Sequence, residues 1–375
     1  MGFVEKRGGK YRARYRDPLG RSTSCTFPRK ADAQRFLLEV ESEKLRGNWL
    51  DPRDAEMPLA AWAETFLSLC RRLSEGTQET YRRDLERYVL PRFGAHRLGR
   101  LPAEEIEQWL NDEIAAGIAP SSVHRHYRTL RRMLQVAVQK QKLLANPCDR
   151  VDPPRVPMKE MVFLDWEQAV RLAELHPPRY RAMIYLAVDS GMRWSELVGL
   201  RRSKVDTARR KVRVTEQLVR LASGEFVRRE PKTTAGVRSI TISGFTSAVI
   251  AEHLERFSAP GPDGLMFPNG SGNPLAASSF LTHHFDPARR AAGVDCRFHD
   301  LRHTSVALAI ASNAHPKTIQ ARMGHASINV TLDRYGHLLP ELDEAIAEEF
   351  GRQLSRAIAK RNNVVIEADF RPTDT

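Results

Sequence analysis

Hydrophobic and polar residues alternate strictly in one short stretch near the start of the chain. In KYRARYR, residues 10–16, arginine occupies every second position from residue 12 on. One face of this segment therefore carries Arg12, Arg14 and Arg16. A period of two residues is typical of a β-strand. The turn sequence DPLG at 17–20 and the stretch RSTSCTF then predict a hairpin, with a further strand over 3–6. An amphipathic helix follows, so we expect residues 1–50 to form a three-stranded sheet with one helix.

Residues 56–150 show a different period, because their apolar residues lie three and four positions apart, as in α-helices. The segment after Pro120 has its apolar residues on one stripe: Val123, Tyr127, Leu130, Leu134 and Ala137. Its other faces carry basic side chains: Arg125, Arg128, Arg131 and Arg132. Charge on a helix is usually no more than a solvated face, but nearly all of this charge has one sign, which solvation does not require. We expect an all-helical domain over 56–150 with a basic surface.

The last part of the chain mixes both periods. The stretch NPCDRVDPPRVPMKE at 146–160 holds four prolines, which cannot continue a helix, so residues 151–160 are predicted to be an extended linker. From 161 to 345, helical periods surround three strand-like pieces, KVRVTEQ, EFVRRE and VRSITI. This order predicts a mostly helical domain with a small inserted antiparallel sheet, and 346–375 is expected to be a tail with a helical start. The fold class is therefore α+β, in several domains.

Length and charge narrow the class of protein. A chain of 375 residues exceeds one typical core, which agrees with two or three domains. Its net charge is +13 and its pI is about 9.8, and a surface so basic attracts polyanions, of which nucleic acid is the commonest. Charge alone leaves open a basic protein without such a partner. An arginine face on a small sheet fits a DNA groove, although a solvated edge sheet is the alternative there.

Other classes find less support in the sequence. The four cysteines are far apart and form no C-x-x-C pair, so neither a disulfide framework nor a zinc knuckle is expected. No apolar leader and no run of 18 apolar residues occurs, so we expect a cytoplasmic protein without a membrane span. His299 and His303 have the spacing of a helical zinc pair, but Asp300 stands where zinc proteases have glutamate. We expect neither a metal nor a cofactor.

Six polar residues between positions 193 and 335 can be interpreted one by one or together. Singly, each has an ordinary explanation: Arg193 can pair with Glu196, Lys232 can be a solvated turn residue, and Tyr335 can be a packing aromatic. Together they match phosphoryl transfer, which requires cations around a phosphate, a nucleophile, and an acid for the leaving oxygen. A phenol is easier to deprotonate beside guanidinium and imidazole groups. The candidate site is therefore Arg193, Lys232, His299, Arg302, His325 and Tyr335.

The stretches that carry these residues resemble the tyrosine recombinases of the phage-integrase type. They are SGMRWSELVGLRRSKVD, PKTTAGVRSITI, FHDLRHTSVALAIASNAHPKTIQARMGH and ASINVTLDRYGHL, in the family's order and with its spacing. HDLRHT followed by MGHASINVTLDRY is the most specific part. The strong resemblance covers about 160–340, and weaker ones cover 56–150, similar to the helical core-binding domain, and 3–50, similar to a small arm-type DNA-binding domain. Met323 stands where the family usually has leucine, a volume-conserving change.

The resemblance implies a role for each candidate residue. Arg193 and Arg302 would clamp the scissile phosphate, while Tyr335 would attack it and become a 3′-phosphotyrosine. Lys232 would be the general acid on the 5′ oxygen, and His299 would assist proton transfer. His325 would donate a hydrogen bond to the transition state, and Glu196 would be an acidic brace.

The implied function is that of a site-specific DNA recombinase, an integrase that inserts or excises a phage or another mobile element. Its implied DNA partner is double-stranded DNA at core and arm-type sites. Its implied protein partners are three further copies of the chain, in a tetramer that passes through a Holliday junction, and accessory DNA-bending or directionality proteins. Two alternatives stay open: a type IB topoisomerase-like relaxing enzyme, and a DNA-binding regulator that cuts nothing. The sequence does not decide whether Tyr335 acts in its own site or in a neighbour's.

Overall fold

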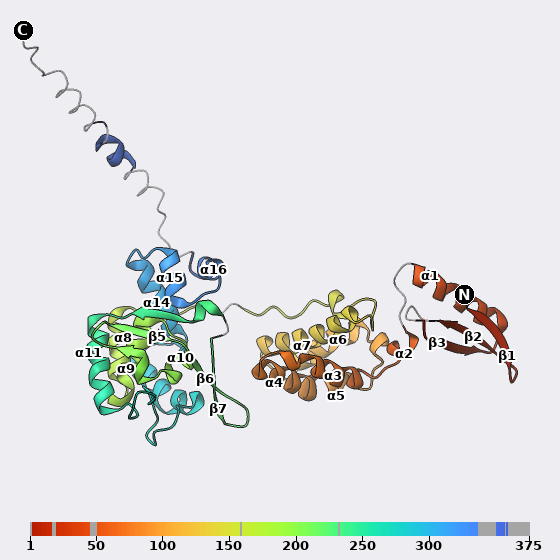
Figure 1. Ribbon diagram of the computed structural model, residues 1–375, viewed down its shortest axis with the longest axis horizontal. Helices are drawn as coiled ribbons and strands as arrows, with labels where there is room; N and C mark the ends of the chain where they lie inside the picture. The colour runs from red at the N-terminus through yellow and green to blue at the C-terminus, as the bar shows by residue number, and fades with distance from the viewer. Residues whose placement is uncertain are drawn as a thin grey trace, which may run out of the picture. The chain divides into compact units, whose positions relative to one another are not determined.

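The computed structural model of the chain describes residues 2–16, 20–45, 51–157, 160–231, 233–336, 350–356 and 358. It divides into two compact units, Met1–Met158 and Lys159–Thr375, whose elements are labelled in Figure 1. Small antiparallel sheets occur among many helices in both units. The expected α+β class with several domains is confirmed.

The first unit begins with a three-stranded antiparallel sheet in the order β1-β2-β3, followed by one helix: β1 (Phe3–Arg7), β2 (Lys10–Arg16), β3 (Ser22–Phe27) and α1 (Lys30–Leu45). The alternation of β2 buries Ala13 and Tyr15, and the Tyr15 ring packs edge-on against Phe36 of α1 at 5.6 Å between centroids. Gly8 and Gly9 both have positive φ and make the tight turn from β1 to β2. The other face of β2 is the arginine face, as predicted.

The rest of this unit is a helical bundle. Its helices are α2 (Pro52–Ala55), α3 (Leu59–Leu69), α4 (Glu75–Asp84), α5 (Leu90–Phe93), α6 (Ala103–Ala115) and α7 (Pro120–Gln139), with a π-turn over Leu85–Val89 and 3-10 turns over Cys70–Arg72, Leu98–Arg100 and Pro147–Arg150. All five residues of the predicted stripe on α7 are buried. Trp62 is 2% exposed and its indole N–H donates to the Met133 carbonyl at 3.1 Å, so replacing it by alanine would cost about 3–5 kcal/mol.

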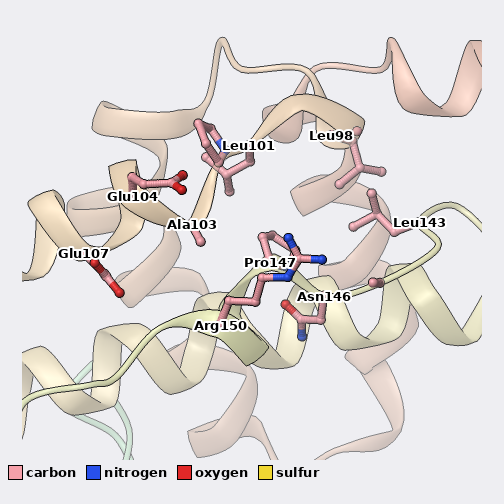
Figure 2. Close-up of a pocket in the computed structure, with 12 residues that line it drawn as sticks. Leu98, Leu101, Ala103, Glu104, Glu107, Leu143, Asn146, Pro147 and Arg150 are labelled. Carbon is pink, nitrogen blue, oxygen red and sulfur yellow. The ribbon is translucent and has the colours of Figure 1, made fainter.

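A cavity of about 430 Å³ lies in this bundle, between the start of α6 and the turn Pro147–Arg150. Figure 2 shows the apolar Leu98, Leu101 and Leu143 around it together with the charged Glu104 and Arg150.

The second unit opens with helices, continues with short strands and ends with helices. These elements are α8 (Trp166–Glu174), α9 (Pro178–Ser190), α10 (Trp194–Gly199), β4 (Val205–Asp206), β5 (Lys211–Val214), β6 (Gln217–Arg220), β7 (Phe226–Arg229), β8 (Arg238–Thr241), α11 (Gly244–Arg256), α12 (Ala277–Phe280), α13 (Asp286–Ala292), α14 (Asp300–Ala311), α15 (Pro316–Met323) and α16 (Asn329–Tyr335). Further turns are the 3-10 turns Arg202–Lys204 and Thr234–Gly236 and the π-turn Leu281–Phe285.

The strands of this unit differ in one respect from the three pieces expected from the sequence. They form two sheets, a three-stranded one in the order β4-β5-β8 and a separate hairpin of β6 and β7. The predicted piece KVRVTEQ is divided, because β5 ends at Val214 and β6 begins at Gln217. Leu218 of β6 is buried against α10, where a side chain on Gly199 would collide with the β6 backbone.

The core of the second unit surrounds α9, which contacts α8, α11 and α14. A smaller apolar cluster joins the last three helices through Val306, Ile310, Ile319, Met323 and Tyr335. Figure 1 shows α14, α15 and α16 beside one another, in blue. Of the predicted tail, residues 350–356 are helical, and most of the rest lies outside the described residues. No described helix combines the length and the apolar character that a membrane crossing requires.

Candidate active site

The first turn of helix α14 carries two of the six candidate residues, His299 and Arg302, together with His303. His299 is the N-cap of this helix, and Arg302 and His303 follow within one turn. The carboxylate of Asp300 fixes the turn, because it accepts hydrogen bonds from the Arg297 backbone N–H and guanidinium, both at 2.7 Å. Residues three apart on a helix share a face, so His299 and Arg302 point the same way.

The Arg302 guanidinium is buried and held by backbone oxygens rather than by an acid. Its Nη1 donates to the Gly191 carbonyl at 2.5 Å and its Nη2 to the Met323 carbonyl at 2.7 Å. Gly191 has φ +64 and ends α9, and a Cβ there would lie 2.5 Å from the Met323 Cε, so this turn requires glycine. Burial and the neighbouring Arg193 lower the pKa of Arg302 to about 9, which leaves it cationic at neutral pH. Among the described residues, Arg302 is therefore a desolvated cation with no carboxylate hydrogen-bonded to it, although Glu196 acts on it electrostatically.

Arg193 stands at the start of α10 and is braced by Glu196. The backbone N–H of Arg193 donates to the Glu196 carboxylate at 2.8 Å, and its Nη1 does so at 2.9 Å. The Arg193 side chain nevertheless keeps 39% of its surface exposed, so its remaining donors can reach an anion. The acidic brace predicted from the sequence is in place beside Arg193.

A further arginine, not selected in the sequence, completes this brace. Arg238 of β8 donates to both oxygens of Glu196 at 3.1 and 2.9 Å, and both side chains are almost fully buried. Burial by itself would raise the pKa of Glu196, but its hydrogen bonds to Arg238 and to the Arg193 backbone outweigh that effect and lower the pKa. Arg238 lies in the predicted strand piece VRSITI. The sequence signal for it was a charged residue two positions before Ile240, and therefore on the same strand face as that apolar residue.

Tyr335 lies at the end of α16 and is 2% exposed. Its hydroxyl hydrogen-bonds to Nδ1 of His303 at 2.5 Å, and it stands close enough to Arg302 to influence the pKa of that guanidinium. His303 was considered in the sequence only as half of a zinc pair. In the structure the rings of His299 and His303 meet edge to face at 5.0 Å, and the Nδ1 atom of His303 is engaged by the phenol.

The two remaining histidines of the site differ in their surroundings. Burial, and secondly Arg302, lower the pKa of His299, so this imidazole is neutral at neutral pH and able to exchange a proton. His325 follows Gly324, which ends α15 with φ +66, and its Nδ1 is 2.9 Å from the Thr331 hydroxyl of α16. His325 thus connects the end of α15 to the helix that carries Tyr335.

Lys232 lies outside the described residues, whereas the residues that follow it, from Thr233 on, are described. Thr233 and the 3-10 turn Thr234–Gly236 lead from there into β8. A Cβ on Gly324 would lie 2.8 Å from the Ala235 carbonyl, so this turn packs against the residue before His325. The structure therefore brings together Arg193, Glu196, His299, Arg302 and Tyr335. It places His325 two residues after Met323, whose carbonyl accepts from Arg302.

The predicted DNA-contact arginines occur in two different states. Arg125 donates to Asp84 at 3.1 Å and Arg131 to Asp149 at 2.7 Å, so both already have a carboxylate partner. Arg128 and Arg132 are exposed and form no ion pair with any other residue that the structure describes. On the sheet, Arg12 and Arg14 approach the Glu5 carboxylate at 3.8 and 3.6 Å, whereas Arg16 is exposed.

A basic hollow that sequence reasoning did not find lies in the second unit. It measures about 340 Å³ and is lined by four cations with one carboxylate: Lys204, Arg209, Lys211, Arg213 and Asp206. Ser239 of β8 also lines it, and since alternate residues of a strand face opposite sides, the hollow lies on the sheet face away from Arg238.

Comparison with known proteins gives consistent matches. The model of the phage integrase family matches residues 162–341, and that of the phage integrase N-terminal SAM-like domain matches residues 62–141. The prophage phiRv2 integrase of Mycobacterium tuberculosis is 31% identical over 351 residues, which cover 90% of this chain and 92% of that protein. The integrase of Mycobacterium phage L5 is 25% identical and covers 92% of this chain and 96% of its own.

Two groups of solved structures share the fold. The Tn1549 transposon integrase in complex with a circular intermediate DNA superposes with a TM-score of 0.68 at 20% identity, over 79% of this chain and 99% of the other. The lambda integrase tetramer bound to a Holliday junction gives a TM-score of 0.54 at 19% identity, over 86% and 95%.

Proposed function

The chain belongs to the phage integrase family and is a site-specific tyrosine recombinase, and from this premise we propose that Tyr335 cleaves DNA through a 3′-phosphotyrosyl intermediate. Exchanging a phosphodiester for a phosphotyrosyl ester conserves the bond energy, so strands can be cut and rejoined without a nucleotide cofactor. The reaction integrates or excises a mobile element, and it takes place in the cytoplasm of the bacterial host, at its DNA.

One observation carries this proposal: the buried Tyr335 hydroxyl shares its surroundings with Arg302, although 33 positions separate them. Arg302 is fixed by two carbonyls, and Arg193 is fixed by Glu196 with part of its surface still open. Around Glu196 the cations Arg193, Arg238 and Arg302 outnumber the carboxylate, so the site has an excess of positive charge. A scissile phosphate supplies the missing negative charge, and preorganised cations stabilise the additional charge of the transition state.

The remaining roles follow from the chemistry of each group. Arg193 and Arg302 hold the two non-bridging oxygens, since guanidinium forks match that geometry. Lys232 protonates the departing 5′ oxygen, His299 assists proton transfer as a neutral imidazole, and His325 donates a hydrogen bond to the transition state.

The domains divide the binding of DNA. We assign 56–150 to the core site, 1–50 to arm-type sites, 151–160 to the linker, 161–345 to catalysis and 346–375 to a tail. Arg16, Arg128 and Arg132 are the best placed of the predicted contacts, because each is exposed and without an acidic partner among the described residues. Arg12, Arg14, Arg125 and Arg131 would have to share or exchange a carboxylate. The basic hollow at β5 is an additional phosphate contact.

The assembly on DNA is proposed to be a tetramer. The lambda integrase, which shares this fold, forms a tetramer on a Holliday junction, and recombination between two duplexes requires four cleavages. Accessory proteins that bend DNA or set the direction of the reaction would complete the complex.

The test is a trapping experiment with a nicked duplex that carries the attachment site, identified from the direct repeats that flank the element. Loss of the short fragment beyond the nick prevents rejoining, so wild type should accumulate a covalent protein–DNA adduct. Tyr335→Phe should form no adduct and bind the duplex within about twofold of wild type, because only the nucleophile is lost.

Further assays separate the alternatives. A topoisomerase-like enzyme would form the same adduct, but it would relax supercoiled DNA that lacks this site and would not join two duplexes. A regulator would bind without any adduct, and that result with wild type would reject the proposed function.

A further inference from the structure

The phenol of Tyr335 has a partner that the proposed mechanism does not use. Its hydroxyl lies 2.5 Å from Nδ1 of His303, and both side chains are almost inaccessible, at 2% and 5% exposure. Their rings are inclined at 51° with centroids 5.7 Å apart, so the contact is made by the hydroxyl at the ring edge. A buried imidazole therefore contacts the atom that must lose its proton when Tyr335 becomes a nucleophile.

The position of His303 is fixed independently of Tyr335. It lies on α14 directly after Arg302, whose guanidinium is fastened to the Gly191 and Met323 carbonyls. One turn earlier, His299 packs edge-on against the His303 ring at 5.0 Å. The helix start is fixed in turn by the hydrogen bonds between Asp300 and Arg297. The same short helix therefore places a phosphate-binding cation and an imidazole at adjacent positions.

The surroundings also suit an imidazole that becomes charged. Asp300 precedes His303 by three residues on α14, and the two groups interact electrostatically. A buried carboxylate on the same helix face stabilises an imidazolium, as the acidic partner does in other nucleophile–histidine pairs. Arg302 cannot take up the phenolic proton, because it is already a cation. The phenol hydrogen-bonds to His303 and His299 packs on the His303 ring, so His303 is placed to take the proton first and His299 assists from behind it.

We propose that His303 is the catalytic base of this recombinase, which accepts the phenolic proton of Tyr335 during cleavage and returns it during rejoining. The inference rests on the proposed function of Tyr335. In the cleavage step the Tyr335 Oη–phosphorus bond forms, the bond from phosphorus to the 5′ oxygen breaks, and the phenolic proton passes to Nδ1 of His303. The leaving 5′ oxygen takes its proton from Lys232. Rejoining reverses each transfer, and His303 protonates the departing phenolate.

Two substitutions separate proton transfer from simple support of the tyrosine. In His303→Asn, an amide atom occupies nearly the place of Nδ1 and can still hydrogen-bond the phenol, but it cannot accept a proton. In His303→Ala both functions are removed. If His303 is the base, both variants should form adduct on the nicked duplex about 10²–10⁴-fold more slowly than wild type. Wild-type rates in His303→Asn would reduce the residue to a support and overturn the proposal.

A small nucleophile tests whether His303 acts through Tyr335. Hydrogen peroxide can be offered to Tyr335→Phe, where it replaces the phenol and attacks the phosphate directly. Peroxide is itself a weak acid, so its cleavage is compared at a fixed concentration of the hydroperoxide anion, which reaches the phosphate with no proton to lose. Under that condition, adding His303→Asn to Tyr335→Phe should change the rate by less than about threefold. An equal loss with both nucleophiles would show that His303 acts on the phosphate or on the fold, and would overturn the proposal.

Controls keep this inference distinct from the proposed function. His283→Asn, at an exposed position of the same unit, should cleave like wild type. Binding of the duplex and the melting temperature of each variant report on folding. If wild type itself forms no adduct, the proposed function fails. If wild type forms it and His303→Asn equals it, only the role of His303 fails.

Discussion

The helical bundle and the second unit each bury a carboxylate between two arginines, and they use it differently. In the bundle, Asp84 is fully buried and accepts from Arg83 and Arg125, whose side chains remain 43% exposed. In the second unit, Glu196 is equally buried between Arg193 and Arg238. The difference is a third arginine, because Arg302 is buried beside the second pair and donates its hydrogen bonds to carbonyl oxygens.

This difference separates a structural ionic network from one prepared for a ligand. The Asp84 group continues into further satisfied contacts, since Arg125 also meets His126, which hydrogen-bonds to Glu113 at 2.8 Å and stacks on Tyr88. Its charges are matched within the bundle. The Glu196 group is not balanced, and burying an unmatched cation costs free energy unless an anion arrives. The excess of positive charge around Glu196 and its burial together therefore support a phosphate site. Neither the burial alone nor the charge alone would support one.

The largest expected effect comes from removing the unmatched cation. Arg302→Met should slow adduct formation by about 10³–10⁵-fold, since a phosphate-clamping arginine contributes that much to phosphoryl transfer. Stability should change little, because the repulsion from Arg193 is relieved while two hydrogen bonds of about 1 kcal/mol each are lost. Single-turnover cleavage and urea unfolding measure the two quantities. A variant that unfolds while the purified folded fraction still cleaves normally would assign Arg302 to the fold.

The opposite pattern is expected for the balanced network. Asp84→Asn weakens the hydrogen bonds of a fully buried acceptor and should lower the free energy of unfolding by about 1–3 kcal/mol, since the two arginines stay half exposed and solvated. Adduct formation by the folded protein should be retained, because the proposed catalytic residues lie in the other unit. Asp112→Asn is the matched control, since its ion pair with Arg92 is half exposed and should contribute less than about 1 kcal/mol. Equal unfolding midpoints for both variants would contradict the structural role of Asp84.

A smaller effect should separate the arginines of α7 by their partners. Arg128→Gln should weaken binding of the core duplex and reduce the slope of log K against log salt by about 1, as expected for one phosphate contact. Arg131→Gln should change the slope less, because Arg131 must leave Asp149 before it meets a phosphate. Affinities measured across a salt series test this order. The reverse order would mean that the Asp149 pair presents Arg131 to DNA rather than withholding it.

The smallest effect concerns pH and distinguishes the two units again. Burial lowers the pKa of His176, His253, His284 and His299, all of them in the second unit. The unfolded chain takes up protons on these histidines below about pH 6.5, whereas the folded unit resists them, so its stability falls as pH decreases from there. Between about pH 7 and pH 5.5, hydrogen exchange should show lost protection in α9 and α11 after correction for intrinsic rates. Unchanged protection would mean that these histidines titrate normally.

Much of this protein is predictable because it depends on short-range patterns. Alternation in KYRARYR determined β2 and its arginine face, and the apolar stripe of α7 determined which side of that helix is buried. The motifs around Arg193, Arg302 and Tyr335 identified the chemistry, because phosphoryl transfer requires a small set of residue types. The division of KVRVTEQ between two sheets was less accessible, since a break between strands depends on what each packs against.

The tertiary structure alone decided which of these residues are partners. Arg238 meets Glu196 from 42 positions away, His303 meets Tyr335 across 32, and the carbonyl of Gly191 holds Arg302 across 111. Periodicity reports only on neighbours within a turn or a strand, and a backbone carbonyl has no signature in a side-chain motif. The sequence by itself determined the elements and indicated the candidate reacting groups. Packing of α9, α14 and α16 determined which imidazole contacts the phenol and which arginine, within the described part of the chain, is hydrogen-bonded to carbonyl oxygens alone.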